Sequence, residues 1–195
     1  MKIILTSSGL TSEKLKRKFI KLIDKPINQN KFLLMFGVRN NEELKYVNES
    51  EQELIRLGIN KNNITRVNFA KEVDLSKLNN FNAIYFCGGN TFYILDRIRK
   101  TKLDSLIKDF INKEGLYVGV SAGSIILGPS IEIAGWGSEG DSNDVKLIDL
   151  SGLNLTKMSI FPHYKPSLKK EIKEFKRKIS YKVKVLKDGQ GILIK

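Results

Sequence analysis

Residues 116–127 read LYVGVSAGSIIL, and the change of character within this stretch decides the fold. The first five residues, LYVGV, form a continuous apolar run, which is typical of a strand buried on both faces of a parallel sheet. The small residues from Ser121 onward are compatible with a helix. A buried strand followed at once by a helix predicts an α/β protein, with Ser121 at the carboxyl edge of the sheet.

The same alternation continues on both sides of this stretch. Apolar runs predict further strands at 2–6, 31–38, 64–69, 83–87 and 158–161, and helical spacing predicts helices at 14–23, 92–99, 103–112 and 168–179, with one more from a cap at Asn40 to about Leu57. The last residues, 183–195, predict a hairpin around Asp188-Gly189. We find no repeat or linker, and therefore expect one three-layer α/β/α domain over residues 1–195, with a mostly parallel, flavodoxin-like sheet.

The composition is that of an ordinary globular protein. Of 195 residues, 41% are hydrophobic and 28% are charged, and Cys87 is the only cysteine, which favours a cytoplasmic protein from a reducing compartment. No targeting segment is evident, and no stretch approaches the roughly 18 apolar residues of a membrane helix. The net charge of +13 is dispersed, and its densest run, 169–178, includes Glu171 and Glu174. We therefore expect neither a nucleic-acid nor a membrane partner.

The pentapeptide Gly119-Val120-Ser121-Ala122-Gly123 matches the pattern G-x-S-x-G between a strand and a helix. A sharp turn of this kind strains the backbone of the serine, and bulky flanking residues would clash, which explains the glycines. The turn lifts the hydroxyl above the sheet edge, where open α/β folds bind ligands. Ser121 is therefore a candidate nucleophile, although a small-residue packing turn would give the same pattern.

A serine nucleophile needs a base, a group that orients the base, and donors for the oxyanion. His163, the only histidine, follows the predicted strand 158–161 and is the candidate base. Backbone N–H groups of Ala122 and of the Gly88-Gly89 turn are candidate donors. In α/β hydrolases the acid lies between serine and histidine in the chain. The candidates there are Glu132, Glu139, Asp141, Asp144 and Asp149.

Several segments together resemble the aspartyl dipeptidase (peptidase E) family of serine peptidases. The matching segments are 87–92 (CGGNTF), 119–124 (GVSAGS), 128–129 (GP), 152–155 (GLNL) and 161–164 (FPHY). They lie in the family's order and at similar spacing, between about residues 80 and 165. The resemblance implies a fold similar to that of class I glutamine amidotransferases, with a serine where those enzymes carry cysteine.

The resemblance also implies roles for individual residues. Ser121 would be the nucleophile and His163 the base, with an oxyanion hole formed by Gly88, Gly89 and Ala122, and with neither a metal nor an organic cofactor. Family members carry an aspartate between the serine and the histidine. Counting back from the histidine favours Asp141, with Asp144 as the alternative, whereas counting forward from the serine arrives at Trp136.

The function that the resemblance implies is a serine peptidase acting on short peptides, as a monomer or homodimer. It would be an exopeptidase or dipeptidase that removes an N-terminal acidic residue through a Ser-His-Asp acyl-enzyme mechanism. One alternative is a catalytically inactive or regulatory ligand-binding protein that retains the fold, and it predicts no carboxylate near the imidazole of His163. A second alternative is an enzyme that uses Cys87, which the sequence places at the end of a buried strand.

Overall fold

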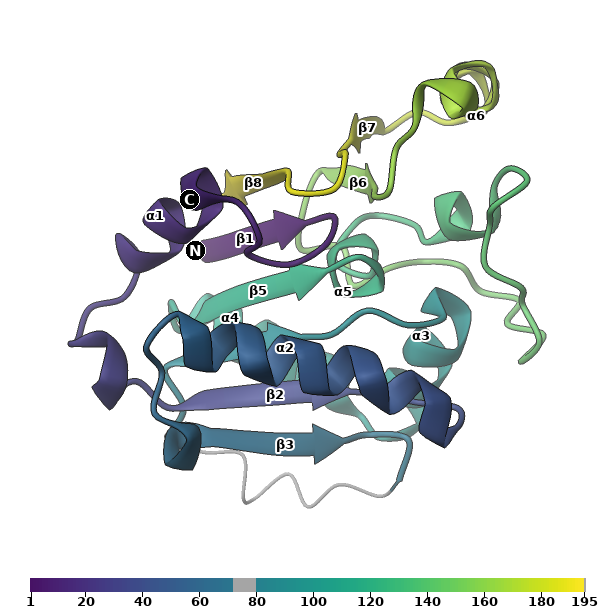
Figure 1. Cartoon of the computed structure of the whole chain (residues 1–195). Helices are drawn as coiled ribbons and strands as arrows, with labels where there is room; N and C mark the ends of the chain where they lie inside the picture. Colours follow the sequence, from purple (N-terminus) through teal and green to yellow (C-terminus); the bar gives the residue numbers. More distant parts are fainter. Residues whose placement is uncertain (72–79, 195) are drawn as a thin grey trace.

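A six-stranded sheet forms the centre of the computed structural model, which describes residues 1–71 and 80–194 (Figure 1). Its strands are β1 (Lys2–Thr6), β2 (Phe32–Phe36), β3 (Ile64–Asn68), β4 (Ala83–Phe86), β5 (Leu116–Val120) and β8 (Gly191–Ile194). The strands lie in the order β3-β2-β4-β5-β1-β8. The first five run parallel, and β8 is antiparallel to β1, so the predicted mostly parallel sheet is confirmed.

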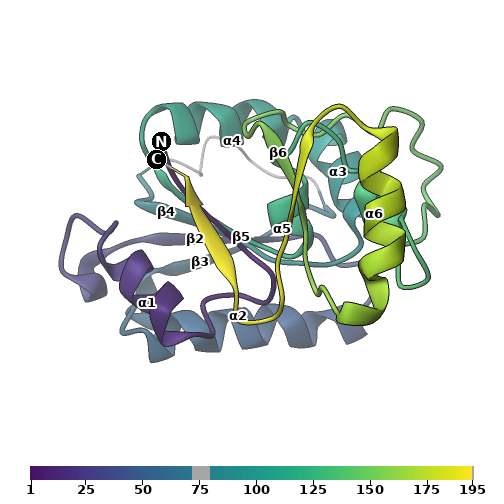
Figure 2. The same ribbon diagram turned by 90° about the horizontal axis from the view of Figure 1, so that it is seen from above.

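Helices cover both faces of this sheet, which gives the three expected layers (Figure 2). One face carries α1 (Glu13–Ile20) and α2 (Leu44–Arg56), and the other carries α3 (Thr91–Lys100) and α4 (Leu103–Asn112). A short helix, α5 (Ala122–Ile125), follows β5 directly. Beside the main sheet, β6 (Met158–Phe161) pairs in parallel with β7 (Lys182–Val185), and α6 (Lys169–Lys178) connects these two strands.

The strands of the sheet are buried on both faces, and alternate residues feed two separate cores. In β2, Leu33 and Met35 belong to the cluster that includes α3 and α4. Phe32, Leu34 and Phe36 belong to the cluster that includes α1 and α2. All five side chains are 5% exposed or less. This double burial explains why the strand sequences read as continuous apolar runs rather than as alternating ones.

Asparagine caps fix the starts of two structural segments on either side of the sheet. The side chain of Asn40 accepts a hydrogen bond from the backbone N–H of Glu43, at the short 3₁₀ turn that leads into α2. The side chain of Asn90 accepts one from Tyr93 N–H and begins α3. Each cap satisfies a backbone donor that would otherwise have no partner at a helix start.

The C-terminal segment does not form the predicted hairpin. Strand β7 pairs with β6 in the small sheet, whereas β8 pairs with β1 in the main sheet. The reason is that β1 would otherwise leave a row of unpaired backbone groups at the sheet edge, and β8 satisfies them. The connection 186–190 therefore passes from one sheet to the other, close to the carboxyl end of β1.

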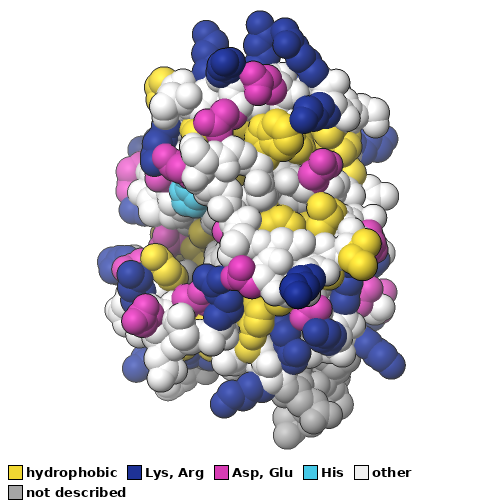
Figure 3. All heavy atoms as spheres, turned by 90° about the vertical axis from the view of Figure 1, so that its right-hand side faces the viewer, with side chains coloured by type: hydrophobic (Ala, Val, Ile, Leu, Met, Phe, Trp, Pro, Cys, Tyr) yellow, Lys and Arg dark blue, Asp and Glu magenta, His cyan; other side chains and the backbone are white. Residues whose placement is uncertain are grey.

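The charged surface is mixed on the face seen in Figure 3. Lysine and arginine side chains are scattered over it, with acidic side chains between them, and a group of basic side chains lies at the top of the view, over α6. Across residues 1–71 and 80–194, no helix is both long enough and apolar enough to cross a membrane.

Candidate active site

Ser121 lies at a strained turn between β5 and α5. Its φ is 49° and its ψ is −112°, a left-handed conformation that is unusual for a residue with a side chain. The flanking glycines let the chain close up around it. A Cβ on Gly119 would lie 2.5 Å from the carbonyl oxygen of Gly123, and a Cβ on Gly123 would lie 2.5 Å from that of Phe86. The turn is thus built as the G-x-S-x-G pattern predicts.

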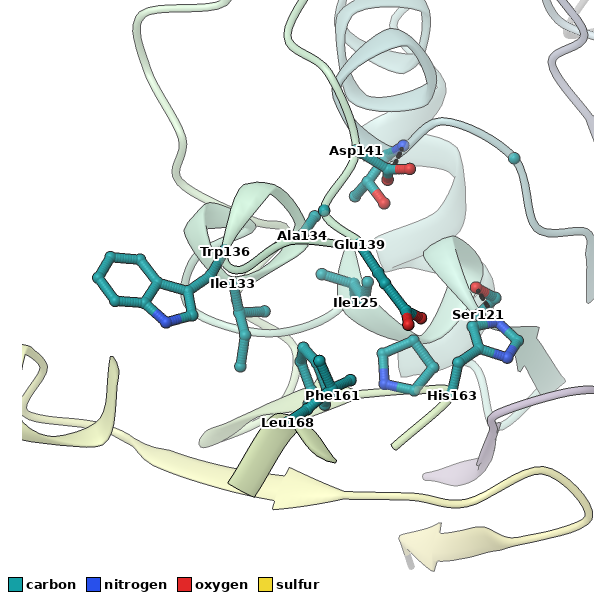
Figure 4. A pocket seen from close by; sticks show the side chains of 14 residues that line it. Ser121, Ile125, Ile133, Ala134, Trp136, Glu139, Asp141, Phe161, His163 and Leu168 are labelled. Atoms are coloured by element: carbon teal, nitrogen blue, oxygen red, sulfur yellow. Dashed lines mark hydrogen bonds between the residues drawn. The ribbon is translucent and has the colours of Figure 1, made fainter. Parts of the chain in front are cut away.

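The imidazole of His163 contacts the hydroxyl of Ser121. Nε2 lies 2.9 Å from the Oγ of Ser121. Figure 4 shows the two side chains next to each other. His163 follows β6, which belongs to the small sheet rather than to the main one as the sequence had suggested. Its backbone N–H donates to the Oγ of Ser7 at 2.7 Å, just beyond β1. The structure therefore brings Ser121 and His163 together, although His163 comes from the small sheet and not from the main sheet.

The carboxylate beside the imidazole is Asp188. Its Oδ1 lies 2.7 Å from Nδ1 of His163 and also accepts a hydrogen bond from the Oγ of Ser7 at 2.8 Å. Partial burial by itself raises the pKa of Asp188, but the hydrogen bonds from Ser7 and His163 outweigh it and hold the pKa below its usual value. An ionised Asp188 only accepts hydrogen bonds, so Nδ1 carries the proton and Nε2 is free to accept one from Ser121.

Asp141, the acid expected from the sequence, does not contact the imidazole. Its Oδ2 instead accepts a hydrogen bond from the backbone N–H of Thr91 at 2.8 Å (Figure 4). Thr91 is the first residue of α3, and the free N–H groups and the dipole of a helix start attract a carboxylate. The expectation that Asp141 orients His163 is therefore corrected, and Asp188 takes that position.

The other acidic candidates also have different partners. Asp144 accepts a hydrogen bond from Ser142, Glu139 pairs with Lys165, and Asp149 pairs with Arg99. Glu132 is exposed in a 3₁₀ turn.

The sequence reasoning missed Asp188 and Ser7 because it searched only between the serine and the histidine. The order serine, acid, histidine holds for α/β hydrolases, but here the acid comes last. Two backbone hydrogen bonds bring it into place: Tyr164 N–H donates to the carbonyl of Leu186, and Leu186 N–H donates to that of Phe161. The Asp-Gly pair shortly after a strand predicts a hairpin turn, and this local pattern does not indicate a position beside His163.

The Gly88-Gly89 turn lies against the serine, at the end of β4. A Cβ on Gly88 would lie 3.2 Å from the Cβ of Ser121 and 3.8 Å from its Oγ. Gly89 has a φ of +145°, which residues with side chains rarely adopt. Ala122 begins α5, where the first backbone N–H groups have no partner within the helix. Gly88 thus lies against Ser121, Gly89 lines the same two pockets as Ser121, and Ala122 follows it in the chain. Their role as oxyanion donors stays a prediction.

Two pockets meet at Ser121 and His163. The smaller has a volume of about 100 Å³ and is the one drawn in Figure 4. The larger has a volume of about 630 Å³, and α2 contributes much of its lining, including Glu53 and Arg56. Ser121 and His163 therefore border both a small space and a large one.

Cys87 is unsuited to nucleophilic chemistry. Its side chain is fully buried, and burial raises the pKa of its thiol to about 12. The reactive form of cysteine is the thiolate, which is scarce at neutral pH for such a group. Among the residues that the structure describes, no cluster of three His, Cys, Asp or Glu side chains could hold a metal ion.

A strained serine, a histidine and an aspartate are joined by hydrogen bonds at the carboxyl edge of an α/β sheet. This arrangement defines the serine hydrolase class of site. The chain belongs to peptidase family S51, because the model of that family matches residues 3–195. The resemblance to peptidase E is thereby confirmed.

Individual relatives agree with this family. A peptidase E of Salmonella paratyphi A is 27% identical over 172 residues, which are 85% of this chain and 69% of the relative. An uncharacterized peptidase of Listeria monocytogenes is 37% identical over 97 residues, and the match covers 50% of this chain and about half (47%) of that relative's length. A crystal structure of a candidate peptidase E protein from Listeria monocytogenes has a TM-score of 0.80 and 26% identity, and the match covers 99% of this chain and 93% of that one.

Proposed function

We propose that this protein is a serine peptidase that removes the N-terminal residue from short peptides. The observation that carries the proposal is the continuous hydrogen-bond chain from Ser121 Oγ through His163 to Asp188. Such a chain gives a serine the base that it needs near neutral pH. Membership of family S51 supports the same reaction class.

The geometry supports an acyl-enzyme mechanism. Nε2 of His163 accepts the hydroxyl proton while Ser121 Oγ attacks the carbonyl carbon of the scissile peptide bond. The backbone N–H groups of Gly89 and Ala122, with Gly88 beside them, stabilise the oxyanion. The imidazolium, stabilised by Asp188, then gives the proton to the leaving amine. A water molecule, deprotonated by His163, hydrolyses the ester and restores the free serine.

The two pockets support an exopeptidase that binds the N-terminal residue in the smaller one. Asp141 lines this pocket and offers negative charge to a peptide ammonium group, whereas Glu139 beside it is already paired with Lys165. The larger pocket contains Arg56, a cation suited to the C-terminal carboxylate of a short peptide.

The inactive, ligand-binding alternative is less well supported. It requires that no carboxylate lie near the imidazole, whereas Asp188 Oδ1 lies 2.7 Å from Nδ1 of His163. The Cys87 alternative is disfavoured by complete burial of the thiol. The acidic N-terminal residue that the resemblance implied depends on the lining of the smaller pocket.

The test is hydrolysis of a panel of dipeptides and tripeptides by the wild type and by Ser121→Ala. We expect the wild type to release the N-terminal residue, and we expect N-acetylated versions of the same peptides to resist cleavage. Ser121→Ala should fold normally but lose turnover and lose covalent labelling by a fluorophosphonate. Normal turnover by Ser121→Ala would refute the proposed mechanism.

A further inference from the structure

The wall of the smaller pocket is mainly hydrophobic. The apolar side chains that line it, in addition to Pro162, are Ile125, Ile133, Ala134, Trp136, Phe161 and Leu168. Ile125, Ile133 and Leu168 are each 5% exposed or less, so they form a fixed part of the molecule rather than a mobile rim. Figure 4 shows these side chains grouped on one side of the space, across from Ser121 and His163.

The charged side chains that line this pocket are acidic. They are Glu139 and Asp141, and the described residues of its lining include neither a lysine nor an arginine. The carboxylate of Glu139 is in contact with a cation, Lys165. Its Nζ is already engaged by both carboxylate oxygens of Glu139, at 2.9 and 2.7 Å. An acidic substrate side chain would therefore enter a space that offers carboxylates and hydrocarbon but no unpaired cation.

This lining has a direct consequence for the residue that the pocket accepts. Burying an unpaired carboxylate beside other carboxylates is strongly unfavourable, whereas burying a hydrocarbon side chain is favourable. A volume of about 100 Å³ suits one side chain rather than a longer piece of peptide. Building on the function proposed above, we infer that the N-terminal residue removed by this protein is hydrophobic, of about the size of leucine or methionine, and not acidic.

The experiment compares kcat/KM for a set of dipeptides that share a C-terminal alanine and differ in the first residue. The first residues are Leu, Met, Phe, Ala, Asp, Glu and Lys. We expect Leu-Ala and Met-Ala to exceed Asp-Ala and Glu-Ala by at least about tenfold, because an unpaired carboxylate must lose its hydration to enter the pocket. Fluorophosphonate labelling of Ser121 is measured in parallel, to report on the nucleophile independently of the peptide.

The outcomes separate this inference from the proposed function. Preference for Asp-Ala, Glu-Ala or Lys-Ala would overturn the inference and leave the peptidase intact. If none of the peptides is hydrolysed, both the proposed peptidase function and the inference are overturned. Preference for the hydrophobic first residues supports both.

Two variants test whether the pocket wall causes the preference. Leu168→Ala removes part of the wall and should raise the ratio of kcat/KM for Phe-Ala over Ala-Ala by roughly tenfold. Leu153→Ala is the matched control, because Leu153 is 6% exposed against 5% for Leu168 but does not line either pocket. The control should leave that ratio unchanged. An equal change of the ratio in both variants would show that the wall does not select the substrate.

Lys165→Met tests the remaining cation. If Lys165 left Glu139 to bind acidic substrates, this variant would lose activity toward Asp-Ala selectively. We expect instead that the order of preference among the seven peptides is unchanged. A selective loss with Asp-Ala of tenfold or more would contradict the inference.

Discussion

At the scale of single residues, the site depends on one oxygen atom. Oδ1 of Asp188 lies within hydrogen-bond distance of both Nδ1 of His163 and the hydroxyl of Ser7. The same Ser7 hydroxyl accepts the backbone N–H of His163. Ser7 therefore fixes the acid and the base relative to each other, although it does not line the small pocket.

Asp188→Asn should lower kcat by roughly 10²–10⁴-fold, because an amide does not stabilise the imidazolium and favours the wrong imidazole tautomer. The measurement is steady-state kinetics on a hydrolysed dipeptide, with circular dichroism to show that the fold is intact. Asp141→Asn is the matched control. It keeps the chain from Ser121 to Asp188 and should act mainly on KM, through weaker binding of the ammonium group. A larger loss of kcat in Asp141→Asn than in Asp188→Asn would contradict the assignment of the acid.

At the scale of elements, local patterns predicted the strands and helices well, and long-range pairing was the part that they missed. The bounds of β5 and α4 were predicted without error, since each is a single periodic run with clear ends. The hairpin at 183–195 was wrong because β8 pairs with β1, a partner almost two hundred residues away in sequence. The sequence pattern did not predict Asp188 as the acid for the same reason, because only the pairing of β8 with β1 brings the chain at Asp188 past His163.

The two sides of the serine turn should respond differently to an added methyl group. Gly119→Ala places a Cβ 2.5 Å from the backbone oxygen of Gly123, which cannot move aside without separating β5 from α5. We expect a loss of stability of about 1–3 kcal/mol or more, measured by urea unfolding. For Gly88→Ala, the atoms nearest to the added Cβ are the side chain of Ser121 and the Val120 carbonyl oxygen, at 3.2–3.8 Å. It should unfold near the wild-type midpoint but lose at least about tenfold in kcat. Equal stability of both variants would contradict this account of the turn.

Helix α2 carries a carboxyl group whose ionisation is unfavourable in the folded protein. Burial raises the pKa of Glu53, and hydrogen bonds from Tyr85 O–H and Leu10 N–H oppose this only in part. Because the pKa is raised in the folded state, the contribution of Glu53 to the free energy of unfolding is fully present below the pKa of the unfolded state, about 4.3. This contribution is lost as the pH rises through the pKa of the folded state. Glu53→Gln can still accept both hydrogen bonds, and should therefore gain Tm relative to the wild type as pH rises from 4 to 8.

The control for Glu53 is Glu49→Gln, which removes an exposed carboxyl from the same helix and the same large pocket. Its Tm difference from the wild type, measured by thermal unfolding at several pH values, is the baseline for the comparison. If the difference for Glu53→Gln changes no more with pH than this baseline does, the buried carboxyl does not titrate as its surroundings require.

At the scale of the whole molecule, the site is assembled from three distant parts of the chain. Ser121 follows a central strand, His163 follows the small sheet, and Asp188 lies in the connection that joins the small sheet to the main one. The sequence identified the first two because each follows an apolar run. The third depends on how the sheets fit together, which no local pattern records.

Cys87 offers a test of the whole fold, because it is the only thiol and lies buried directly after strand β4 in the middle of the sheet order. Its side chain is 0% exposed and burial raises its pKa to about 12, so at pH 8 only about one thiol in ten thousand is a thiolate. We expect iodoacetamide to leave the native protein unlabelled and fully active over hours. Labelling should appear with added urea in step with the loss of circular dichroism, since the thiol reacts only when the sheet opens.

The control is Cys87→Ala, which should remain unlabelled at every urea concentration and corrects for reaction at other side chains. Rapid labelling without denaturant, accompanied by loss of activity, would instead mean that the sheet opens locally beside Ser121 and that the thiol is within reach of the site.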